Sequence, residues 1–311
     1  MPLAETARVE EDLAEPPRAE RCEWCGGAIG AGAVRRAHRA RCPACRSWTT
    51  EPVPTELELD RAYAGWYRPE GGRFGGAGDS LLRRLRSGLA SRLARIAPAG
   101  GILDVGAGDG SLVGALRGRG RQAVGIDRVS SAPLVKETAL ADVEGQWAGI
   151  VLWHSLEHLR EAGEELRLAV SRLSPDGVLA IAMPNAASLQ ASVFGDRWFA
   201  LDYPRHLVHV PARALRSRLE GLGMSVERVS YWRGGQVVFG WLHGFVGWLP
   251  GRPSLYTAIR RAQARERAMP APVRVATLFA AGLLFPLALL CAAFEVACRR
   301  GGTVYVEARN V

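Results

Sequence analysis

The stretch Gly101-Ile-Leu-Asp-Val-Gly-Ala-Gly-Asp-Gly110 decides the fold of this chain. Residues 102–105 form a short apolar, β-favouring run, and Leu112, Ala115 and Leu116 follow with helical spacing. The residues between them are glycine-rich, and glycine lets the backbone turn tightly and approach a ligand closely. The stretch therefore predicts a buried strand, a loop, and a helix whose first amides point at a bound ligand.

The spacing of the glycines narrows the choice of ligand. Dinucleotide-binding loops read G-x-G-x-x-G, but the position of the third glycine is Ser111 here. The order is instead Asp104-x-Gly-x-Gly-x-Gly110, with an acid inside the strand. A second apolar run ends at Asp127, about 20 residues further on, where an acid binds the ribose hydroxyls of a nucleoside cofactor. The alternative is a tight strand-to-helix turn that binds nothing.

This pattern resembles motif I of the class I S-adenosylmethionine-dependent methyltransferases. The resemblance implies an α/β fold with a Rossmann-like seven-stranded mixed sheet, and S-adenosyl-L-methionine as the cofactor. The positions that match the cofactor site of the family are Asp104, Gly106, Gly108, Gly110, Asp127 and Asp142. The resemblance assigns the ribose to Asp127 and the adenine amino group to Asp142.

The segment after Asp127 is shorter than a complete domain of this class requires. Only 22 residues separate Asp127 from Ile150, the centre of the next apolar run. Two interpretations remain open. Either a vestigial helix occupies residues 133–137, or a third strand, at residues 137–141, follows almost directly.

Four cysteines near the N-terminus have the spacing of a metal site. They form two C-x-x-C pairs, separated by sixteen residues: Cys22, Cys25, Cys42 and Cys45. Four thiolates can hold one structural Zn²⁺ and close its coordination shell, so we expect no catalysis at this metal. A pair of disulfides is the alternative, which the lack of an export signal disfavours. Cys291 and Cys298 lie in apolar sequence and are expected to be buried small hydrophobic residues.

The segment that follows these cysteines adds to the resemblance. Thr55 and Glu58 have the spacing of a capping box at the start of a helix. A zinc ribbon, a Pro-x-Pro segment and paired tyrosines together resemble the N-terminal module of a large bacterial group of these enzymes, the methyltransferase type 23-like group. Residues 81–96 have helical periodicity and are expected to form the entry helix of the domain.

Two histidines are the candidate catalytic residues. His154 directly follows the apolar run 148–153, and ligands of open α/β sheets bind at the carboxyl ends of the strands. The letters H-x-x-E-H at 154–158 also match a zinc-peptidase motif, but that motif requires a helix. The segment resembles instead the LEH element of the type 23-like group, and His206, in the segment 195–207, matches another signature of that group. For His158 a packing role and a functional role are both open.

The composition sets broad limits. The chain has 311 residues, 48% of them hydrophobic, which suffices for a full α/β core and small accessory units. Its net charge of +9 rests almost entirely on arginine, with Lys136 the only lysine, so the charge is weak evidence for a nucleic-acid partner. Residues 1–20 are acidic and lack an apolar core, which predicts a disordered tail without an export signal. We therefore expect a cytoplasmic protein.

An apolar insertion separates the last two expected strands. Residues 224–231 should pair with an antiparallel strand at 303–309, but about seventy residues intervene, and 275–294 contain no charge over a length that can cross a bilayer. Both strands must lie on one side of a membrane, so a single crossing is impossible. We expect a re-entrant or in-plane hairpin at the inner face of the membrane. Its membrane-facing residues would be Arg260, Arg261, Arg265 and Arg267, with Trp241 and Trp248 at the interface. The alternative is a helix buried on the protein or in a dimer; the sequence does not determine the oligomeric state.

These features divide the chain into five parts. They are a disordered tail (1–20), a zinc ribbon (21–50), a linker with entry helices (51–98), a methyltransferase domain (99–232 with 302–311) and the apolar helical insertion (233–301).

Three functions compete. The leading hypothesis is methyl transfer from S-adenosylmethionine to a small-molecule or lipid-linked acceptor, such as a cell-surface glycan or quinone-like precursor, with His154 or His206 as the base. A nucleic-acid methyltransferase is disfavoured, because the strand before His154 does not end in the Asn/Asp-Pro-Pro-aromatic turn of amino-methylating enzymes. The third is a non-enzymatic cofactor-binding scaffold, which the short segment after Asp127 keeps open.

Overall fold

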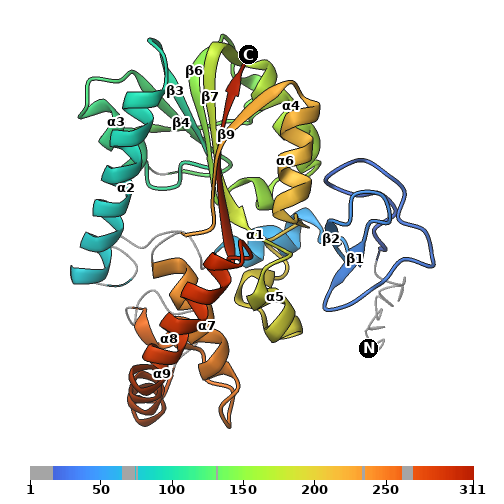
Figure 1. The fold of residues 1–311 in the computed structure, drawn as a ribbon, viewed down its shortest axis with the longest axis vertical. Coiled ribbons are helices and arrows are strands. Elements are labelled where there is room, and N and C mark those ends of the chain that lie inside the picture. The colour runs from blue at the N-terminus through green and yellow to red at the C-terminus, as the bar shows by residue number, and fades with distance from the viewer. Residues whose placement is uncertain (1–16, 65–73, 75, 131, 233–234, 261–268) are drawn as a thin grey trace, which may run out of the picture.

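A seven-stranded sheet forms the centre of the protein (Figure 1). The computed structural model describes residues 17–64, 74, 76–130, 132–232, 235–260 and 269–311. The strands are β3 (Ile102–Val105), β4 (Ala123–Asp127), β5 (Val135–Glu137), β6 (Trp147–Trp153), β7 (Leu173–Pro184), β9 (Met224–Ser230) and β10 (Thr303–Asn310). Their order is β5-β4-β3-β6-β7-β10-β9, and β10 runs antiparallel to both of its neighbours, β7 and β9, while the other pairs are parallel. The predicted mixed sheet, with its antiparallel last strand, is confirmed.

Helices cover both faces of this sheet (Figure 1). On one face lie α2 (Gly76–Ile96) and α3 (Ser111–Arg117), and their apolar side chains pack with β3. On the other lie α4 (Ala162–Ser171) and α6 (Ala212–Gly221), which pack with β6 and β7. The central strands are buried on both faces, which explains their nearly continuous apolar sequences.

The short segment after β4 contains a strand. Among the described residues, β5 follows β4 without a helix between them and pairs with it in parallel. The second interpretation was therefore the correct one, although the strand begins two residues earlier than expected. A single 3-10 turn, η1 (Leu140–Asp142), then leads to β6.

The cysteine-containing segment is joined to the domain by a shared sheet. Strands β1 (Arg39–Arg41) and β2 (Trp48–Thr50) form a hairpin, and β2 also pairs with β8 (Val208–His209). On the other side, the N–H of Gly163 in α4 donates to the carbonyl of Glu23. A side chain at Gly163 would collide with the carbonyl of Trp24, so glycine permits this close contact. The hairpin therefore lies against the domain.

The helix α1 (Glu56–Ala64) begins with the predicted capping box. The N–H of Thr55 donates to Glu58 Oε2 at 2.8 Å, and the N–H of Glu58 donates to Thr55 Oγ1 at 3.2 Å. The two side chains thereby satisfy amides that have no partner inside the helix.

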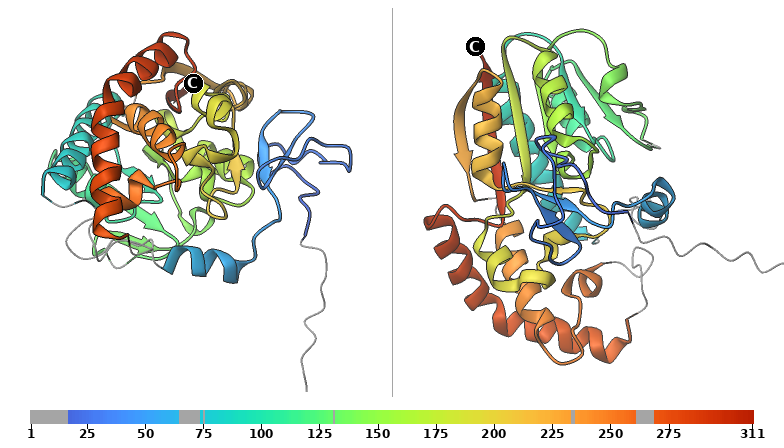
Figure 2. Two further views of the ribbon diagram at one scale, coloured as in Figure 1. Left: turned by 90° about the horizontal axis from the view of Figure 1, so that it is seen from below. Right: turned by 90° about the vertical axis from the view of Figure 1, so that its right-hand side faces the viewer.

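The apolar insertion folds as a helical unit below the sheet (Figure 1). It contains α7 (Gly235–Gly247), α8 (Leu255–Ile259) and α9 (Ala271–Ala297), and α5 (Leu189–Phe194) packs against α7. The helix α9 runs along the outer edge of the unit (Figure 2). Among the described helices it is the one long and apolar enough to cross a membrane. Because β9 and β10 pair antiparallel, both ends of the insertion reach the same sheet.

Two residues expected at a membrane interface are instead buried. The Arg260 guanidinium lies 5.2 Å from the centre of the Tyr256 ring, and the side chain is almost wholly covered. Trp241 packs against Phe194 inside the helical unit, whereas Trp248 is exposed. Stacking on neighbouring rings removes Arg260 and Trp241 from the surface. The other three arginines lie outside the described residues, as do residues 1–16 of the expected tail.

Candidate active site

A large cavity lies at the carboxyl ends of the parallel strands. Its volume is about 2000 Å³, and its walls come from the loops after β3, β4 and β6, from the segment before β8, and from α7 and α8. Ligand pockets usually measure about 300–1,000 Å³. The cavity therefore has room for a nucleoside cofactor and a second molecule beside it.

The glycine loop after β3 forms one wall of the cavity. Gly106 has φ +77°, and a side chain there would place its Cβ 2.4 Å from the Cβ of Ser155. Glycine is thus required twice, by the backbone conformation and by the close approach of the loop after β6. Gly108 also lines the cavity, but Gly110 does not, because it faces Val135 and begins α3.

The predicted acidic residues fall into two groups. Asp104 and Asp127 both line the cavity, and Asp127 Oδ2 accepts a hydrogen bond of 2.7 Å from the N–H of Gly108. This bond holds the carboxylate beside the glycine loop, where it can meet a ribose. Asp142 lies on η1, is exposed, and is not among the residues lining the cavity. Thr138, Ala139 and Leu140 line that part of the wall instead.

His154 lies at the end of β6 in a strained conformation. Its φ of +53° is uncommon for a residue with a side chain, and such strain often marks functional sites. His154 Nδ1 lies 3.2 Å from Glu157 Oε1, and Nε2 lies 3.3 Å from the side-chain oxygen of Gln236 on α7. The carboxylate on Nδ1 orients the ring, and Nε2 faces the cavity wall formed by the helical unit.

His206 is placed in a cluster with two residues of the LEH element. Glu157, His158 and His206 all line the cavity, and one ligand atom from each lies within 4.8 Å of the others. Burial and the neighbouring His206 lower the pKa of His158 to about 4. Burial would raise the pKa of Glu157, but the hydrogen bond with His154 and the nearby rings lower it overall. The cluster therefore contains a carboxylate beside a neutral His158 ring at pH 7.

Asp202 and Arg205 hold the segment that carries His206. Their side chains form an ion pair in which Arg205 Nε donates to Asp202 Oδ2 at 3.1 Å. Asp202 Oδ2 also lies 3.6 Å from His206 Nε2. Burial would raise the pKa of Asp202, but His206 and Arg205 lower it overall. The ion pair of Arg205 with Asp202 thus lies beside the His206 ring and helps to hold it in place.

The hairpin with the cysteines also positions His206, which the sequence did not indicate. The hydroxyl of Thr50 donates to the carbonyl of His206, and the N–H of Thr50 donates to the carbonyl of Leu207 at 2.9 Å. The pairing of β2 with β8 continues this contact. The signal in the sequence, a short apolar run at 207–210, was too short to separate from a loop.

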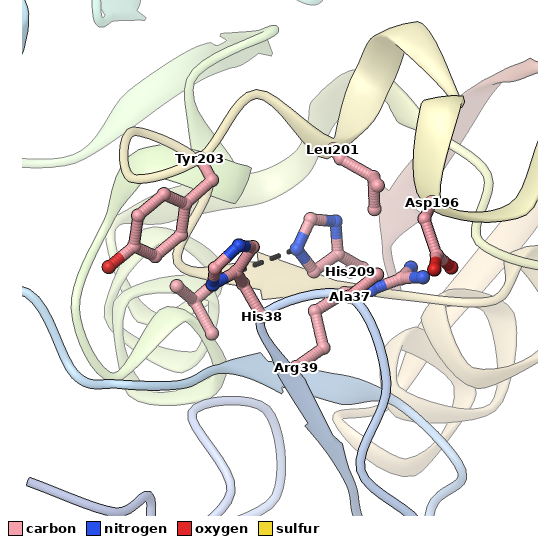
Figure 3. A pocket seen from close by; sticks show the side chains of 8 residues that line it. Ala37, His38, Arg39, Asp196, Leu201, Tyr203 and His209 are labelled. Atoms are coloured by element: carbon pink, nitrogen blue, oxygen red, sulfur yellow. Dashed lines mark hydrogen bonds between the residues drawn. The ribbon is translucent and has the colours of Figure 1, made fainter. Parts of the chain in front are cut away.

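A smaller cavity of about 350 Å³ lies at this junction (Figure 3). Its walls include His209 and Asp196 from the domain and Arg39 from the hairpin. The ring of His38 stacks on Tyr203 with centroids 4.5 Å apart. Polar and aromatic side chains thus surround a hollow at this junction, while Trp24 and Ala40 of the cysteine segment share a buried apolar cluster with Val208 of the domain.

The four N-terminal cysteines converge on one point. Their sulfur atoms lie within 4.8 Å of one another, with Cys22 to Cys45 and Cys25 to Cys42 both at 3.6 Å. A tetrahedral zinc site with Zn–S bonds of about 2.3 Å has sulfur atoms about 3.8 Å apart. The hydrogen bond to Cys45 and burial raise the pKa of Cys22, and the same bond lowers the pKa of Cys45 to about 4. The donor set and its spacing fit Zn²⁺.

Comparison with known proteins finds a methyltransferase family that matches part of the chain. Residues 80–229 match the Methyltransf_23 family model, described as a methyltransferase domain. The sheet is the seven-stranded mixed sheet that the resemblance to class I enzymes implied, with the antiparallel strand β10. Residues 80–229 are therefore similar to this methyltransferase family, and the sheet has the fold of the class I S-adenosylmethionine-dependent methyltransferases.

Several solved structures are similar in fold. They include the (4+2) cyclase SpnF (16% identity, TM-score 0.45, covering 83% of this chain and 97% of that chain). A SAM-dependent methyltransferase from Archaeoglobus fulgidus has 15% identity and a TM-score of 0.42, covering 75% of this chain and 100% of that one. The plantazolicin methyltransferase BamL has 13% identity and a TM-score of 0.42, covering 80% and 94%. No curated protein sequence matches the chain.

Proposed function

We propose that this enzyme transfers the methyl group of S-adenosylmethionine to a small-molecule or lipid-linked acceptor. The observation that carries the proposal is the single cavity that reaches from Gly106 and Asp127 to Phe239 and Tyr256 of the helical unit. The cofactor would occupy the end at the glycine loop, and the acceptor the end formed by the helices. The sulfonium supplies the reactive methyl group, and the protein contributes position and proton transfer.

His154 is the residue we propose as the base. Its Nδ1 contacts the Glu157 carboxylate, so the proton resides on Nδ1 and Nε2 is free to accept one. The Gln236 side-chain nitrogen, 3.2 Å away on the opposite wall, can donate to Nε2, which places this nitrogen at the border between the two ends of the cavity. An acceptor hydroxyl that takes the place of the Gln236 side chain would donate its proton there.

Calorimetric titration with S-adenosylmethionine tests the cofactor assignment. Asp127→Ala should weaken binding roughly tenfold to hundredfold, because hydrogen bonds to a charged group contribute about 1.5–3 kcal/mol. Asp142→Ala is the matched control, and the exposed position of Asp142 predicts unchanged affinity. His154→Gln should bind the cofactor normally and transfer no labelled methyl group to cell extracts. Binding of a nicotinamide dinucleotide in place of S-adenosylmethionine would refute the proposal.

We further propose that α9 rests in the plane of a lipid surface at the inner face of the membrane. Its large apolar residues form one exposed stripe, namely Val275, Phe279, Leu283, Leu287, Leu290 and Phe294. Phe279 is 68% and Leu283 69% exposed. The exposed Trp248 at the end of α7 suits the same interface. A lipid-linked acceptor could then enter the cavity from the membrane side.

Co-sedimentation with vesicles of anionic phospholipid tests the lipid contact. Phe279→Ser combined with Leu283→Ser should abolish sedimentation, because each removes about 1.5–3 kcal/mol of apolar transfer. Leu57→Ser, at a site on α1 that is 58% exposed, is the matched control and should sediment as the wild type does. Wild-type protein that stays in the supernatant would contradict the proposal.

We also propose that Cys22, Cys25, Cys42 and Cys45 bind structural Zn²⁺. The support is the convergence of four sulfur atoms in a segment with little apolar surface, where a metal supplies folding energy. Since Thr50 of this hairpin holds the backbone of His206, loss of zinc should also disturb the active site. Metal analysis of Cys22→Ser should show one zinc ion fewer per chain; an unchanged zinc content would exclude the site.

A further inference from the structure

Three side chains at the floor of the large cavity have the chemistry of a metal site that is separate from the cysteines. Glu157 and His158 lie on η2 (Leu156–His158), and His206 lies just before β8. One ligand atom from each lies within 4.8 Å of the other two. The His158 and His206 rings are in edge contact, with centroids 4.6 Å apart.

Both imidazole rings are oriented as they are in metal sites. His158 Nδ1 lies 3.0 Å from the carbonyl of Arg205, and His206 Nδ1 lies 2.9 Å from the carbonyl of Ala200. A backbone carbonyl accepts only from a protonated nitrogen, so Nδ1 carries the hydrogen in each ring. Nε2 then keeps its lone pair, and a carbonyl partner on the other nitrogen is the usual arrangement for a metal-bound histidine. The hydroxyl of Tyr63, 2.9 Å from His158 Nδ1, fixes the first ring further.

One oxygen of the buried Glu157 carboxylate lacks a hydrogen-bond partner among the described residues. The side chain is 1% exposed, and while Oε1 contacts His154, Oε2 has no hydrogen-bond partner among the described residues. A buried oxygen without a partner costs roughly 1–3 kcal/mol, and more when it is charged. A cation between Glu157 and the two rings would satisfy this oxygen and both nitrogen lone pairs.

We propose that Glu157, His158 and His206 bind a divalent first-row transition metal ion, such as Zn²⁺, Mn²⁺ or Fe²⁺. Two imidazoles and one carboxylate suit these ions, whereas Mg²⁺ and Ca²⁺ prefer oxygen ligands alone. Three protein ligands leave coordination positions open, as in catalytic and not in structural sites. Because all three residues line the cavity, a molecule bound there can reach the open positions. Asp202, 3.6 Å from His206 Nε2, adds a second negative charge beside the ion.

The proposed metal site implies that the methyl acceptor is an oxygen nucleophile. This inference rests on the proposed methyl transfer. A metal ion at this wall of the cavity would bind an oxygen nucleophile and lower the pKa of its hydroxyl group. The hydroxyl O–H bond breaks and its proton moves to His154 Nε2. The oxygen forms a bond to the methyl carbon as the carbon–sulfur bond breaks, which yields a methyl ether and S-adenosylhomocysteine. In this assignment His206 is a metal ligand, and His154 alone is the base.

The metal content of the full chain tests the site without any acceptor. Protein dialysed against Co²⁺ or Zn²⁺ should lose one ion per chain in Glu157→Gln and in His206→Gln, relative to the wild type. His243→Gln, which changes a partly buried histidine outside the cluster, is the matched control and should keep the wild-type number. The absorption spectrum of the Co²⁺ protein separates the two sites, because only the cysteine site has thiolate-to-metal charge transfer. That band should persist in both variants.

Two results would overturn the proposal. One is an equal metal content in the wild type, Glu157→Gln and His206→Gln. The other is a variant of Glu157 or His206 that loses only the Co²⁺ ion at the cysteine site, seen as loss of the thiolate-to-metal band. Calorimetry with S-adenosylmethionine distinguishes this failure from a failure of the proposed function, since cofactor binding depends on Asp127 and not on the cluster. The two conservative variants act independently, so misfolding of one leaves the other as the test.

Discussion

The central strands and the helix α9 are the two most apolar parts of the molecule, and they bury their side chains in opposite ways. In β6 and β7, large residues such as Leu152 and Ile181 are fully covered. In α9, the fully buried apolar residues are the small Ala288 and Ala292, while most of the large apolar ones are exposed. Apolar composition alone therefore does not tell whether a segment is a core or a surface for another molecule.

The strands should be much more sensitive to truncation than the outer face of the helix. Leu152→Ala should lower the free energy of unfolding by about 2–5 kcal/mol, because it removes buried methyl groups and leaves a cavity. Denaturant unfolding followed by circular dichroism measures the change. A loss below 1 kcal/mol would show that the centre of the sheet is loosely packed.

A partly buried histidine makes the stability of the helical unit depend on pH. His243 on α7 packs against the rings of Phe199 and Phe239, and burial lowers its pKa from 6.5 to about 4. The unfolded chain therefore binds a proton first as the pH falls. The contribution of the neutral His243 ring to the free energy of unfolding is complete above pH 6.5. It is lost as the pH drops towards 4, and the loss is at most about 3 kcal/mol.

The variant His243→Gln isolates this contribution. Unfolding of the wild type and the variant between pH 7 and 4 should show a steeper loss in the wild type. Parallel curves would mean that His243 is accessible to protons in the folded state.

The inner face of α9 should tolerate only small residues. Ala288 is fully buried in the cluster with Phe194 and Val237, so Ala288→Leu should cost about 1–3 kcal/mol through overpacking. Ala276→Leu, at an exposed position of the same helix, is the control. Equal stability of the two variants would contradict the packing of α9 on α7.

The outer face of α9 should contribute least to stability. Phe279→Ser combined with Leu283→Ser should change the free energy of unfolding in solution by no more than about 0.5 kcal/mol, since both side chains are already exposed. Thermal unfolding without lipid measures this. A large destabilisation would show that these residues pack on another part of the protein or on a second copy.

Local chemistry explains which predictions from the sequence are confirmed. The strand and loop at 102–110 and the last strand that pairs with β9 depend on short-range patterns, and the structure shows both. The capping box at Thr55 is likewise a contact between neighbours in sequence. The position of β5 was less certain, because three residues with one buried side chain give little periodicity.

Contacts between distant segments could not be predicted in the same way. The pairing of β2 with β8 joins residues about 160 positions apart, and no pattern in either strand indicates the partner. The burial of Arg260 depends on the ring of Tyr256, although an arginine next to an apolar run usually faces solvent or headgroups. The β2–β8 pairing and the burial of Arg260 both depend on how segments distant in sequence, or in different turns of the chain, pack together.

The sequence by itself determined the class of fold, the glycine loop, the acid at Asp127 and the cysteine pairs, because each depends on spacing along one short segment. Only the tertiary structure decided that Glu157, His158 and His206 meet, that Asp142 lies away from the cavity, and that α9 turns its large side chains outward. The physical reason is that these features depend on which distant surfaces pack together, and packing is decided by shape and burial over the whole chain.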